Sequence, residues 1–394
     1  MTAPPMTDLR QVAGAGFEAM RSGDVDAARL LFERILRDQP ADETALWGLA
    51  LACRGLGEVA GQLQAVDKVL AANPGHLPGL LMKADLCAAG GDGRAAQAFY
   101  RAAVDRAAAL ASLPLELRDE VHRAEREVAR YADAYEAHLR DELARAGFDP
   151  RRSSSRFGRC LDLLLGKSQV YQQSPTAFYF PELPQRQFYE RSEFPWLAAL
   201  EAKTDVIRDE LLGVLADDDR FFQPYVQSQA DRPRRDYGAL LDNRDWSAFY
   251  LIKAGAEVSE AAARCPETFA AVGQTPLSEA PGRTPSVLFS LLRPGVRIPP
   301  HTGYTNARLI CHLPLIVPEG CGLRVGSETR SWIPGQALIF DDSIEHEAWN
   351  ESSEPRVVLL FDIWRPELTA EERKLVAATL AAVGSYDQNG AAWV

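Results

Sequence analysis

The sequence lacks several features that would assign it to a common class of protein. Its six cysteines form no Cys-x-x-Cys pair, so neither a zinc knuckle nor a disulfide framework is indicated. No apolar stretch reaches the length of about 18 residues that a bilayer span requires, and no Gly-rich turn between strand and helix suggests a dinucleotide or nucleotide-phosphate site. Basic residues are outnumbered, with 43 Lys and Arg against 55 Asp and Glu. A net charge of −12 disfavours nucleic acid as a partner.

The beginning of the sequence also lacks the basic stretch and uninterrupted apolar core of a targeting peptide. We therefore expect a cytoplasmic protein with reduced cysteines that binds neither membranes nor nucleic acid. A chain of 394 residues is long enough for two or three domains, each with its own core.

A 34-residue period is present in the first quarter of the chain. It is marked by small residues and prolines at fixed offsets: Gly23, Gly57 and Gly91, then Ala27, Gly61 and Ala95, then Pro40 and Pro74. Between these positions, apolar residues recur at helical spacing, so each unit is predicted to be a helix hairpin. The pattern resembles the tetratricopeptide repeat over residues 9–108. Such hairpins stack into a solenoid whose concave side often holds a peptide, although packing on a neighbouring domain or dimerisation is an equal alternative here.

The repeats are followed by a charged stretch with few helix breakers, residues 117–148, which predicts a long capping helix. The polar segment DPRRSSSR comes next and contains a proline. We expect a helical repeat domain at 1–148, a linker at 149–170 and a second domain at 171–394.

Beyond about residue 245, the sequence changes to short apolar or alternating runs separated by Gly and Pro, which is typical of a β-sandwich or barrel. Three of the six histidines, His301, His312 and His346, fall within this region. Strand alternation places Arg308 and His312 on one face, which would point into a barrel. Two imidazoles on separate strands can hold iron, copper or zinc, but no HxD or HxE pair is present, and a hydrogen-bonded core histidine is the alternative for each.

Residues 301–368 closely resemble the aspartyl/asparaginyl β-hydroxylase family. The likeness rests on HTGYTN, on HLPL with the following CGLRVG, on WIPGQALIFDDSIEH, and on RVVLLFDIWRP. A weaker likeness extends upstream to Tyr171. The resemblance implies a double-stranded β-helix of the jelly-roll or cupin-like type with flanking helices, so the whole chain is expected to be a multidomain α plus β protein with an N-terminal helical repeat solenoid.

The resemblance also implies an oxygenase that uses Fe(II), 2-oxoglutarate and O2 and lacks the usual carboxylate ligand. His301 and His346 match the two iron ligands, and Asp342 matches the acid that orients an iron-bound water. Three residues match the cosubstrate site, namely Ser290, His312 and Arg356. A guanidinium suits that role because it forms two parallel charge-assisted bonds to a carboxylate.

The substrate pocket departs from the family pattern. Arg308 matches a residue that binds the substrate's carboxylate, but Leu288 and Ile310 stand where animal members have a lysine and an arginine. Three functions remain open: hydroxylation of an Asp or Asn residue in a protein or peptide, hydroxylation of a small molecule such as a free or carrier-bound amino acid, and a non-catalytic repeat scaffold. The intact set of matched residues disfavours the scaffold.

Overall fold

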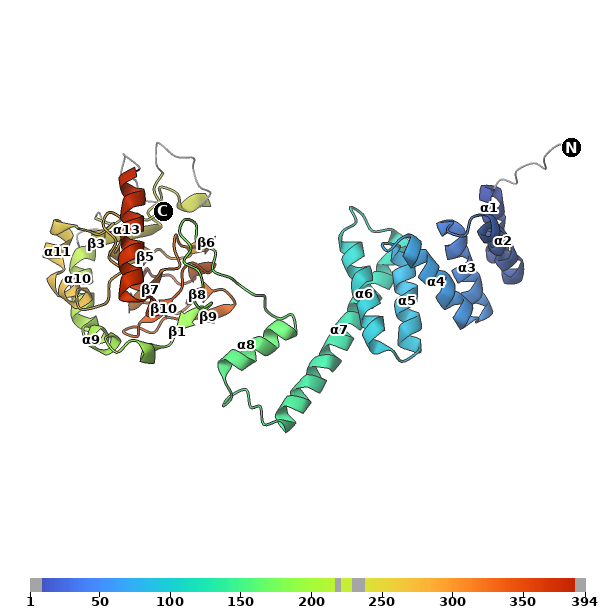
Figure 1. Cartoon of the computed structure of the whole chain (residues 1–394), viewed down its shortest axis with the longest axis horizontal. Helices are drawn as coiled ribbons and strands as arrows, with labels where there is room; N and C mark the ends of the chain where they lie inside the picture. Colours follow the sequence, from blue (N-terminus) through green and yellow to red (C-terminus); the bar gives the residue numbers. More distant parts are fainter. Residues whose placement is uncertain (1–8, 217–220, 229–237, 387–394) are drawn as a thin grey trace. The chain divides into compact units, whose positions relative to one another are not determined.

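Two units divide the chain, residues 1–165 and residues 166–394 (Figure 1). The computed structural model describes residues 9–216, 221–228 and 238–386. The prediction of N-terminal helical repeats followed by a β-rich domain is confirmed.

From residue 9 onward, where its description starts, the first unit contains three helix hairpins. They are built from α1 (Leu9–Ser22) and α2 (Val25–Asp38), α3 (Glu43–Leu56) and α4 (Val59–Ala72), and α5 (Leu77–Ala89) and α6 (Gly93–Ala108). The repeated glycines Gly23, Gly57 and Gly91 form the turns inside the hairpins, with φ of +86°, +72° and +80°. These left-handed conformations favour glycine because it has no Cβ. The 34-residue period therefore marks the turns.

Helix starts and helix contacts follow from the same period. Asp24 and Asp92 each accept a hydrogen bond from the backbone amide three residues further on, at 3.1 and 2.9 Å, which caps α2 and α6. A Cβ at Gly61 would lie 3.0 Å from the Sγ of Cys53, so the small residue lets α3 and α4 approach closely. Each hairpin leaves an apolar face that its neighbour covers.

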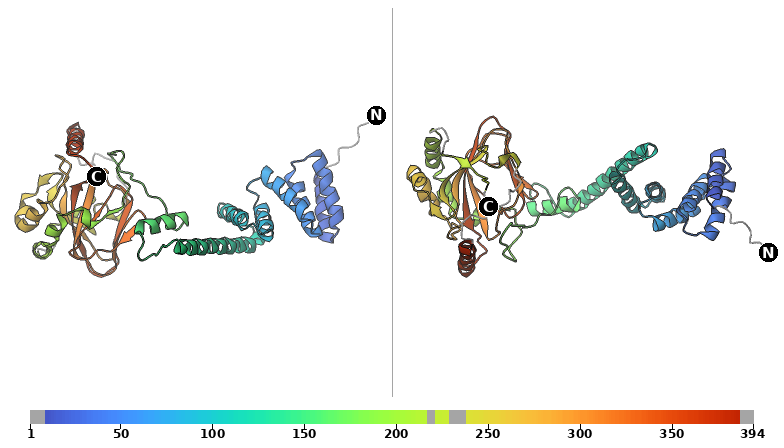
Figure 2. Two further views of the ribbon diagram at one scale, coloured as in Figure 1. Left: turned by 60° about the horizontal axis from the view of Figure 1, so that its bottom comes forward. Right: turned by 90° about the horizontal axis from the view of Figure 1, so that it is seen from above.

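The long helix α7 (Leu115–Arg145) lies where one was predicted and runs without interruption (Figure 2). Its buried residues Val121 and Ala124 belong to the apolar cluster formed with α5 and α6. The segment predicted as a linker contains a further helix, α8 (Ser155–Leu164).

The described residues of the second unit form two antiparallel sheets. The larger one has the order β1-β10-β7-β12-β5-β3-β2, with β4 paired to β3, and the smaller one has the order β6-β11-β8-β9. The strands of the larger sheet are β1 (Phe188–Tyr189), β2 (Gln223–Pro224), β3 (Trp246–Lys253), β4 (Ala256–Glu257), β5 (Val287–Leu292), β7 (Arg308–Ile316), β10 (Leu338–Phe340) and β12 (Arg356–Trp364). Those of the smaller sheet are β6 (Arg297–His301), β8 (Cys321–Val325), β9 (Glu328–Arg330) and β11 (His346–Asn350).

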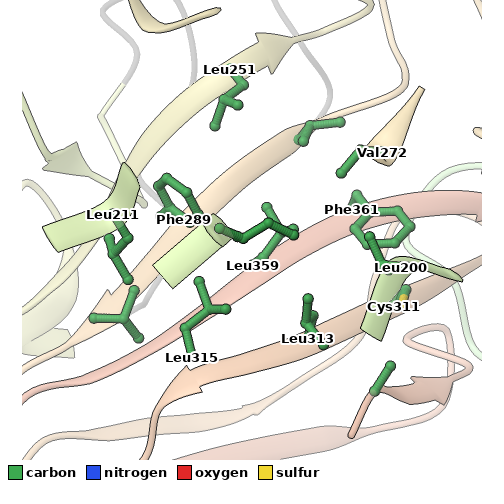
Figure 3. Close-up of a cluster of buried hydrophobic side chains, with 14 of the residues drawn as sticks. Leu200, Leu211, Leu251, Val272, Phe289, Cys311, Leu313, Leu315, Leu359 and Phe361 are labelled. Atoms are coloured by element: carbon green, nitrogen blue, oxygen red, sulfur yellow. The ribbon is translucent and has the colours of Figure 1, made fainter. Parts of the chain in front are cut away.

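Helices cover one face of the larger sheet. They are α9 (Leu197–Glu201), α10 (Thr204–Leu215), α11 (Ser259–Arg264) and α12 (Pro266–Val272), while α13 (Ala370–Tyr386) follows the last strand. Leu200 of α9 and Leu211 of α10 pack with sheet residues such as Phe289 and Leu359 in a fully apolar core (Figure 3). Burial of this area is the main force that holds the helices to the sheet.

A second core lies between the two sheets. The larger sheet contributes Leu288 and Leu360, and the smaller sheet contributes Leu323 and Ala348. Alternate residues of β7 divide between the two cores, with Ile310 facing the smaller sheet and Leu309 facing the helices. Polar side chains on the inner face of the larger sheet are thus enclosed between the sheets.

None of the helices in the described ranges combines the length and the apolar composition that crossing a bilayer requires.

Candidate active site

A cavity of about 220 Å³ opens between the two sheets. Every residue that the sequence assigned to a site lines it, from both sheets and from the turn before β11: Ser290, His301, Arg308, His312, Asp342, His346 and Arg356. Residues separated by up to 66 positions in the sequence therefore meet at one place because the sheets stack face to face.

The two histidines lie side by side on neighbouring strands of the smaller sheet. His301 of β6 and His346 of β11 are register partners, and their ring centroids are 4.1 Å apart. The Nδ1–H of His301 donates to the carbonyl of Pro299 at 2.8 Å, and that of His346 donates to the carbonyl of Ile344 at 3.1 Å. Since a carbonyl can only accept, these bonds fix the tautomer and leave the lone pair of each Nε2 for another partner.

Burial keeps both imidazoles neutral. It lowers the pKa of His301 and lowers that of His346 well below the usual value, and a charge on His301 would further lower the pKa of His346. A neutral imidazole is the form that binds metal ions. In the described part of the chain, no group of three or more His, Cys, Asp or Glu side chains is placed to hold a metal ion.

The turn between β10 and β11 brings Asp342 beside the histidine pair. The amide of Gly303 donates to the backbone carbonyl of Asp342 at 2.7 Å, and Arg308 donates to the Oδ2 of Asp342 at 2.9 Å. The Oδ1 of the same carboxylate is buried without a hydrogen-bond partner. A buried carboxylate oxygen without a donor is unfavourable unless a ligand or water supplies one.

Gly303 leaves the space that this carboxylate occupies. A Cβ at position 303 would lie 2.1 Å from the Oδ2 of Asp342, so Gly303→Ala must displace the aspartate. We expect the free energy of unfolding of the β-rich unit to fall by about 1–3 kcal/mol, as for overpacking in a core. Urea unfolding followed by tryptophan fluorescence measures it, because six of the seven tryptophans lie beyond residue 166.

The matched control is Gly213→Ala in the exposed face of α10, where nothing lies within 4 Å of the added Cβ. That change should leave stability unchanged or raise it by up to about 1 kcal/mol, because alanine is the better helix former. Equal stability of the two variants would contradict the account of Gly303.

Arg356 is a buried cation without a counter-ion. Its side chain is 1% exposed and lies over the ring of Trp332, with the guanidinium carbon 4.8 Å from the ring centroid. Among the described residues, none forms an ion pair with it, and its Nε has no hydrogen-bond partner. Burial lowers the pKa of Arg356 to about 10, so the group keeps its charge at neutral pH. An unpaired buried charge is costly, and an anionic ligand would remove that cost.

His312 and Ser290 lie in the same wall. The indole N–H of Trp246 donates to the Oγ of Ser290 at 3.3 Å, while the Nδ1 of His312 is buried without a partner. Burial, aided by the charge of Arg356, lowers the pKa of His312 to about 3. The site therefore presents a neutral imidazole and a hydroxyl close to a guanidinium.

The lowered pKa predicts a loss of stability in acid. Unfolded His312 takes up a proton near pH 6.5, whereas the folded side chain does so only near pH 3, so its contribution is complete above 6.5 and declines as the pH falls. The slope is about 1.4 kcal/mol per pH unit. When the pH is lowered from 7.5 to 5.0, the free energy of unfolding, measured in urea titrations, should fall in both proteins. The fall should be about 1–2 kcal/mol smaller in His312→Asn than in the wild type. An identical decline in both proteins would show that His312 protonates normally in the folded state.

Arg308 lies between two carboxylates, one of which the sequence analysis missed. It donates to Asp342 and forms a short ion pair with Asp362, and its guanidinium also lies 4.5 Å from the ring centroid of Tyr304. The second oxygen of Asp362 accepts the amide of Ser286 at 2.7 Å. The sequence did contain an indication of this role of Asp362. It shares the inner face of β12 with Arg356, and a charged residue within an apolar strand needs a partner.

The β-rich domain, which follows a helical repeat unit, thus contains a pocket with two neutral imidazoles and an unpaired guanidinium. Such a pocket is typical of an enzyme active site. Residues 201–366 match the family model described as aspartyl/asparaginyl beta-hydroxylase, and residues 15–76 match a tetratricopeptide repeat model. The chain thus contains a domain of the aspartyl/asparaginyl β-hydroxylase family together with tetratricopeptide repeats, as predicted.

Curated relatives carry hydroxylase names. The chain is 39% identical over 182 residues to the aspartyl/asparaginyl beta-hydroxylase of Mus musculus, which is 46% of this chain and 23% of that protein. It is 36% identical over 181 residues to the ornithine lipid ester-linked acyl 2-hydroxylase of Rhizobium tropici, covering 45% and 60% of the two chains. It is 31% identical over 205 residues to the human aspartate beta-hydroxylase domain-containing protein 2, covering 51% and 53%. The chain therefore spans less than two thirds of the length of these relatives.

Proposed function

We propose that the β-rich domain is a double-stranded β-helix oxygenase that depends on Fe(II) and 2-oxoglutarate. The observation that carries the proposal is the pairing of two neutral imidazoles, each with a free Nε2, with an unpaired buried guanidinium in the same cavity. The relatives' names support hydroxylation as the reaction.

The residues fit a bound Fe(II) ion. His301 and His346 would be its protein ligands, because both imidazoles are neutral and have Nε2 available. The free Oδ1 of Asp342 would accept a hydrogen bond from water at the metal, and the ion pair with Arg308 would hold the carboxylate in place.

The residues also fit 2-oxoglutarate. Arg356 would bind its distal carboxylate through two parallel charge-assisted bonds, and Ser290 and His312 would supply further polar contacts. All three come from the inner face of the larger sheet, opposite the histidine pair of the smaller sheet. The dicarboxylate would thus bridge the two sheets.

Bound Fe(II) would activate O2, so that one oxygen atom enters succinate during decarboxylation of 2-oxoglutarate and the other enters the substrate as a hydroxyl group. The chain's own part is to orient the reactants and to exclude water. Apolar side chains of the inner core, including Ile298, Leu323 and Phe340, line the cavity around the polar groups. This lining strengthens the bonds that Arg356 makes.

We propose the β-carbon of an Asp or Asn residue in a protein or peptide as the position hydroxylated. Arg308 would contact a substrate carboxylate through the N–H groups that its bonds to Asp342 and Asp362 leave over, namely one on each terminal nitrogen and that of Nε, which has no partner. The repeat unit is proposed to bind a protein or peptide partner, as stacked helix hairpins do.

A small molecule, such as a free or carrier-bound amino acid, is the second candidate for the substrate. The observation that favours it is the apolar character of two inner-core positions where the family pattern has cations: Ile310, which lines the cavity, and Leu288, which is fully buried. Such an apolar surface accommodates an apolar chain better than a second carboxylate.

Metal titration tests the proposed ligands. Under anaerobic conditions, the wild type should bind one Fe(II) or Mn(II) per chain, and His301→Ala and His346→Ala should each weaken binding by about a hundredfold or more, since each removes one of two protein ligands. His122→Ala, in the exposed surface of α7, is the matched control and should bind as the wild type does. Unchanged affinity in both site variants would exclude the proposed metal site.

A further inference from the structure

The cavity has two ends, which the strand register defines. Arg356 of β12 and Trp246 of β3 both pair with Leu292 of β5, so they lie at one end. Lys253 is the last residue of β3, beyond Ile252, which pairs with Val287 at the other end of β5. Lys253 and Arg356 both line the cavity, which therefore continues from the proposed 2-oxoglutarate site to an exposed ammonium group.

A β-bulge directs Lys253 into the cavity. Along β3, Trp246, Ala248 and Tyr250 face the inner core, and strict alternation would place residue 252 on the same face. The register of β3 against β5 shifts between Tyr250 and Ile252, and Ile252 packs against the helix-side core instead. The one extra residue in β3 reverses the alternation of side chains beyond it, so the side chain of Lys253 lies on the same face of the sheet as that of Tyr250. Bulges beside sites commonly redirect a side chain in this manner.

Positive charge exceeds negative charge in the cavity wall. Lys253, Arg308 and Arg356 face two carboxylates, Asp342 and Asp362, and Arg283 lies in the wall as well. Both carboxylates pair with Arg308. Among the described residues, Lys253 contacts no acid, and its ammonium lies 4.9 Å from the ring centroid of Tyr250.

This excess remains when the proposed ligands are bound. The charges of Fe(II) and of 2-oxoglutarate cancel, and the cosubstrate's distal carboxylate would pair with Arg356. One cation at the open end is left without a partner in a chain whose net charge is −12.

We propose that Lys253 binds an anionic group of the substrate, a carboxylate or a phosphate, at the end of the cavity away from Arg356. The inference rests on the proposed function and names its substrate class. Lys253 is seven residues beyond Trp246, and one of these is taken up by the bulge, so at about 3.3 Å per residue the two are roughly 20 Å apart along the strand. The proposed 2-oxoglutarate takes up the Arg356 end of that length, so the substrate occupies the other end and presents its anionic group to Lys253.

Paired probes test this on protein loaded with Mn(II) and 2-oxoglutarate without O2. One pair is a peptide with a single asparagine and a glutamate six residues away, and the same peptide with glutamine in place of the glutamate. The other pair is an amino acid amide whose acyl chain ends in a carboxylate, and its methyl-ended analogue. The variants are Lys253→Glu and, as the matched charge reversal outside the cavity, Lys374→Glu on the exposed face of α13. Calorimetry gives each dissociation constant at low and high salt.

In at least one pair, the acidic probe should bind the wild type about tenfold more tightly than its neutral partner, since a bond to a charged group is worth about that much. Lys253→Glu should abolish this preference and leave the affinity for 2-oxoglutarate within twofold, and Lys374→Glu should preserve both. The pair that shows the preference identifies a polypeptide or an acyl chain as the source of the anion. Absence of any preference for acidic probes, or its persistence in Lys253→Glu, overturns the inference. Failure of 2-oxoglutarate to bind before any probe is added would instead overturn the proposed function.

Discussion

Arg356→Met is expected to weaken 2-oxoglutarate binding by about a hundredfold to a thousandfold while metal binding is retained. The substitution removes both charge-assisted bonds to the distal carboxylate, each of which is worth about 1.5–3 kcal/mol. The same change should leave the ligand-free protein at least as stable as the wild type, because it removes a buried charge that has no counter-ion. If Arg356 served only to stabilise the fold, its replacement would lower the stability and leave the affinity for 2-oxoglutarate unchanged.

Two measurements on one sample show whether Arg356 binds the cosubstrate or only stabilises the fold. Calorimetry with Mn(II)-loaded protein gives the affinity for 2-oxoglutarate, and urea unfolding without ligands gives the stability. The control is Arg297→Met, whose half-exposed side chain pairs with Glu347 and Glu351 outside the cavity, and it should change neither quantity appreciably. A destabilised Arg356→Met protein with normal cosubstrate affinity would refute the assignment.

Arg365→Met is expected to destabilise the β-rich unit by about 3–5 kcal/mol, the usual cost of leaving a buried charge unpaired. Arg365 and Asp341 are both fully buried and lie 2.9 Å apart. The arginine also donates to the backbone carbonyls of Asn306 and Pro184, so three segments meet at it. The pair anchors the turn that carries Asp342 and leads to His346.

Urea unfolding of Arg365→Met and of the double variant with Asp341→Asn measures this effect. The double variant should regain part of the lost stability, because the second change removes the orphaned carboxylate charge. Arg330→Met is the control: its ion pairs with Glu190 and Glu328 are partly exposed, so its loss should stay within about 1 kcal/mol. A loss of that size in Arg365→Met would mean that the buried pair has little effect on stability.

The features that the sequence predicted correctly are those that depend on residues close together in the chain. The 34-residue period identified the hairpins because a turn with positive φ requires glycine at the same place in each repeat. Alternation along β7 placed Arg308 and His312 on the inner face because that strand has no bulge before His312. Such features depend on neighbours in the sequence and can be read from it directly.

Other features depend on which strands are neighbours, and the sequence does not specify this. The pairing of Arg308 with Asp362 follows from the register of β7 against β12, and the position of Lys253 follows from a bulge in β3. Asp341 and Arg365 look like ordinary surface charges until the fold buries them. The helix α8 within the predicted linker was missed because its polar N-terminal residues suggested a boundary.

Release of succinate from 2-oxoglutarate tests the central claim most directly. Wild-type protein is reconstituted with Fe(II) without O2, its binding of metal and 2-oxoglutarate is titrated, and O2 is then admitted together with the acidic probes. We predict that the wild type binds both ligands and releases succinate, and that His346→Ala binds the metal about a hundredfold or more weakly and releases no succinate under the same conditions. Arg356→Met should release succinate only when the concentration of 2-oxoglutarate is greatly raised. A wild-type protein that binds neither ligand and releases no succinate would contradict the account and favour a non-catalytic scaffold.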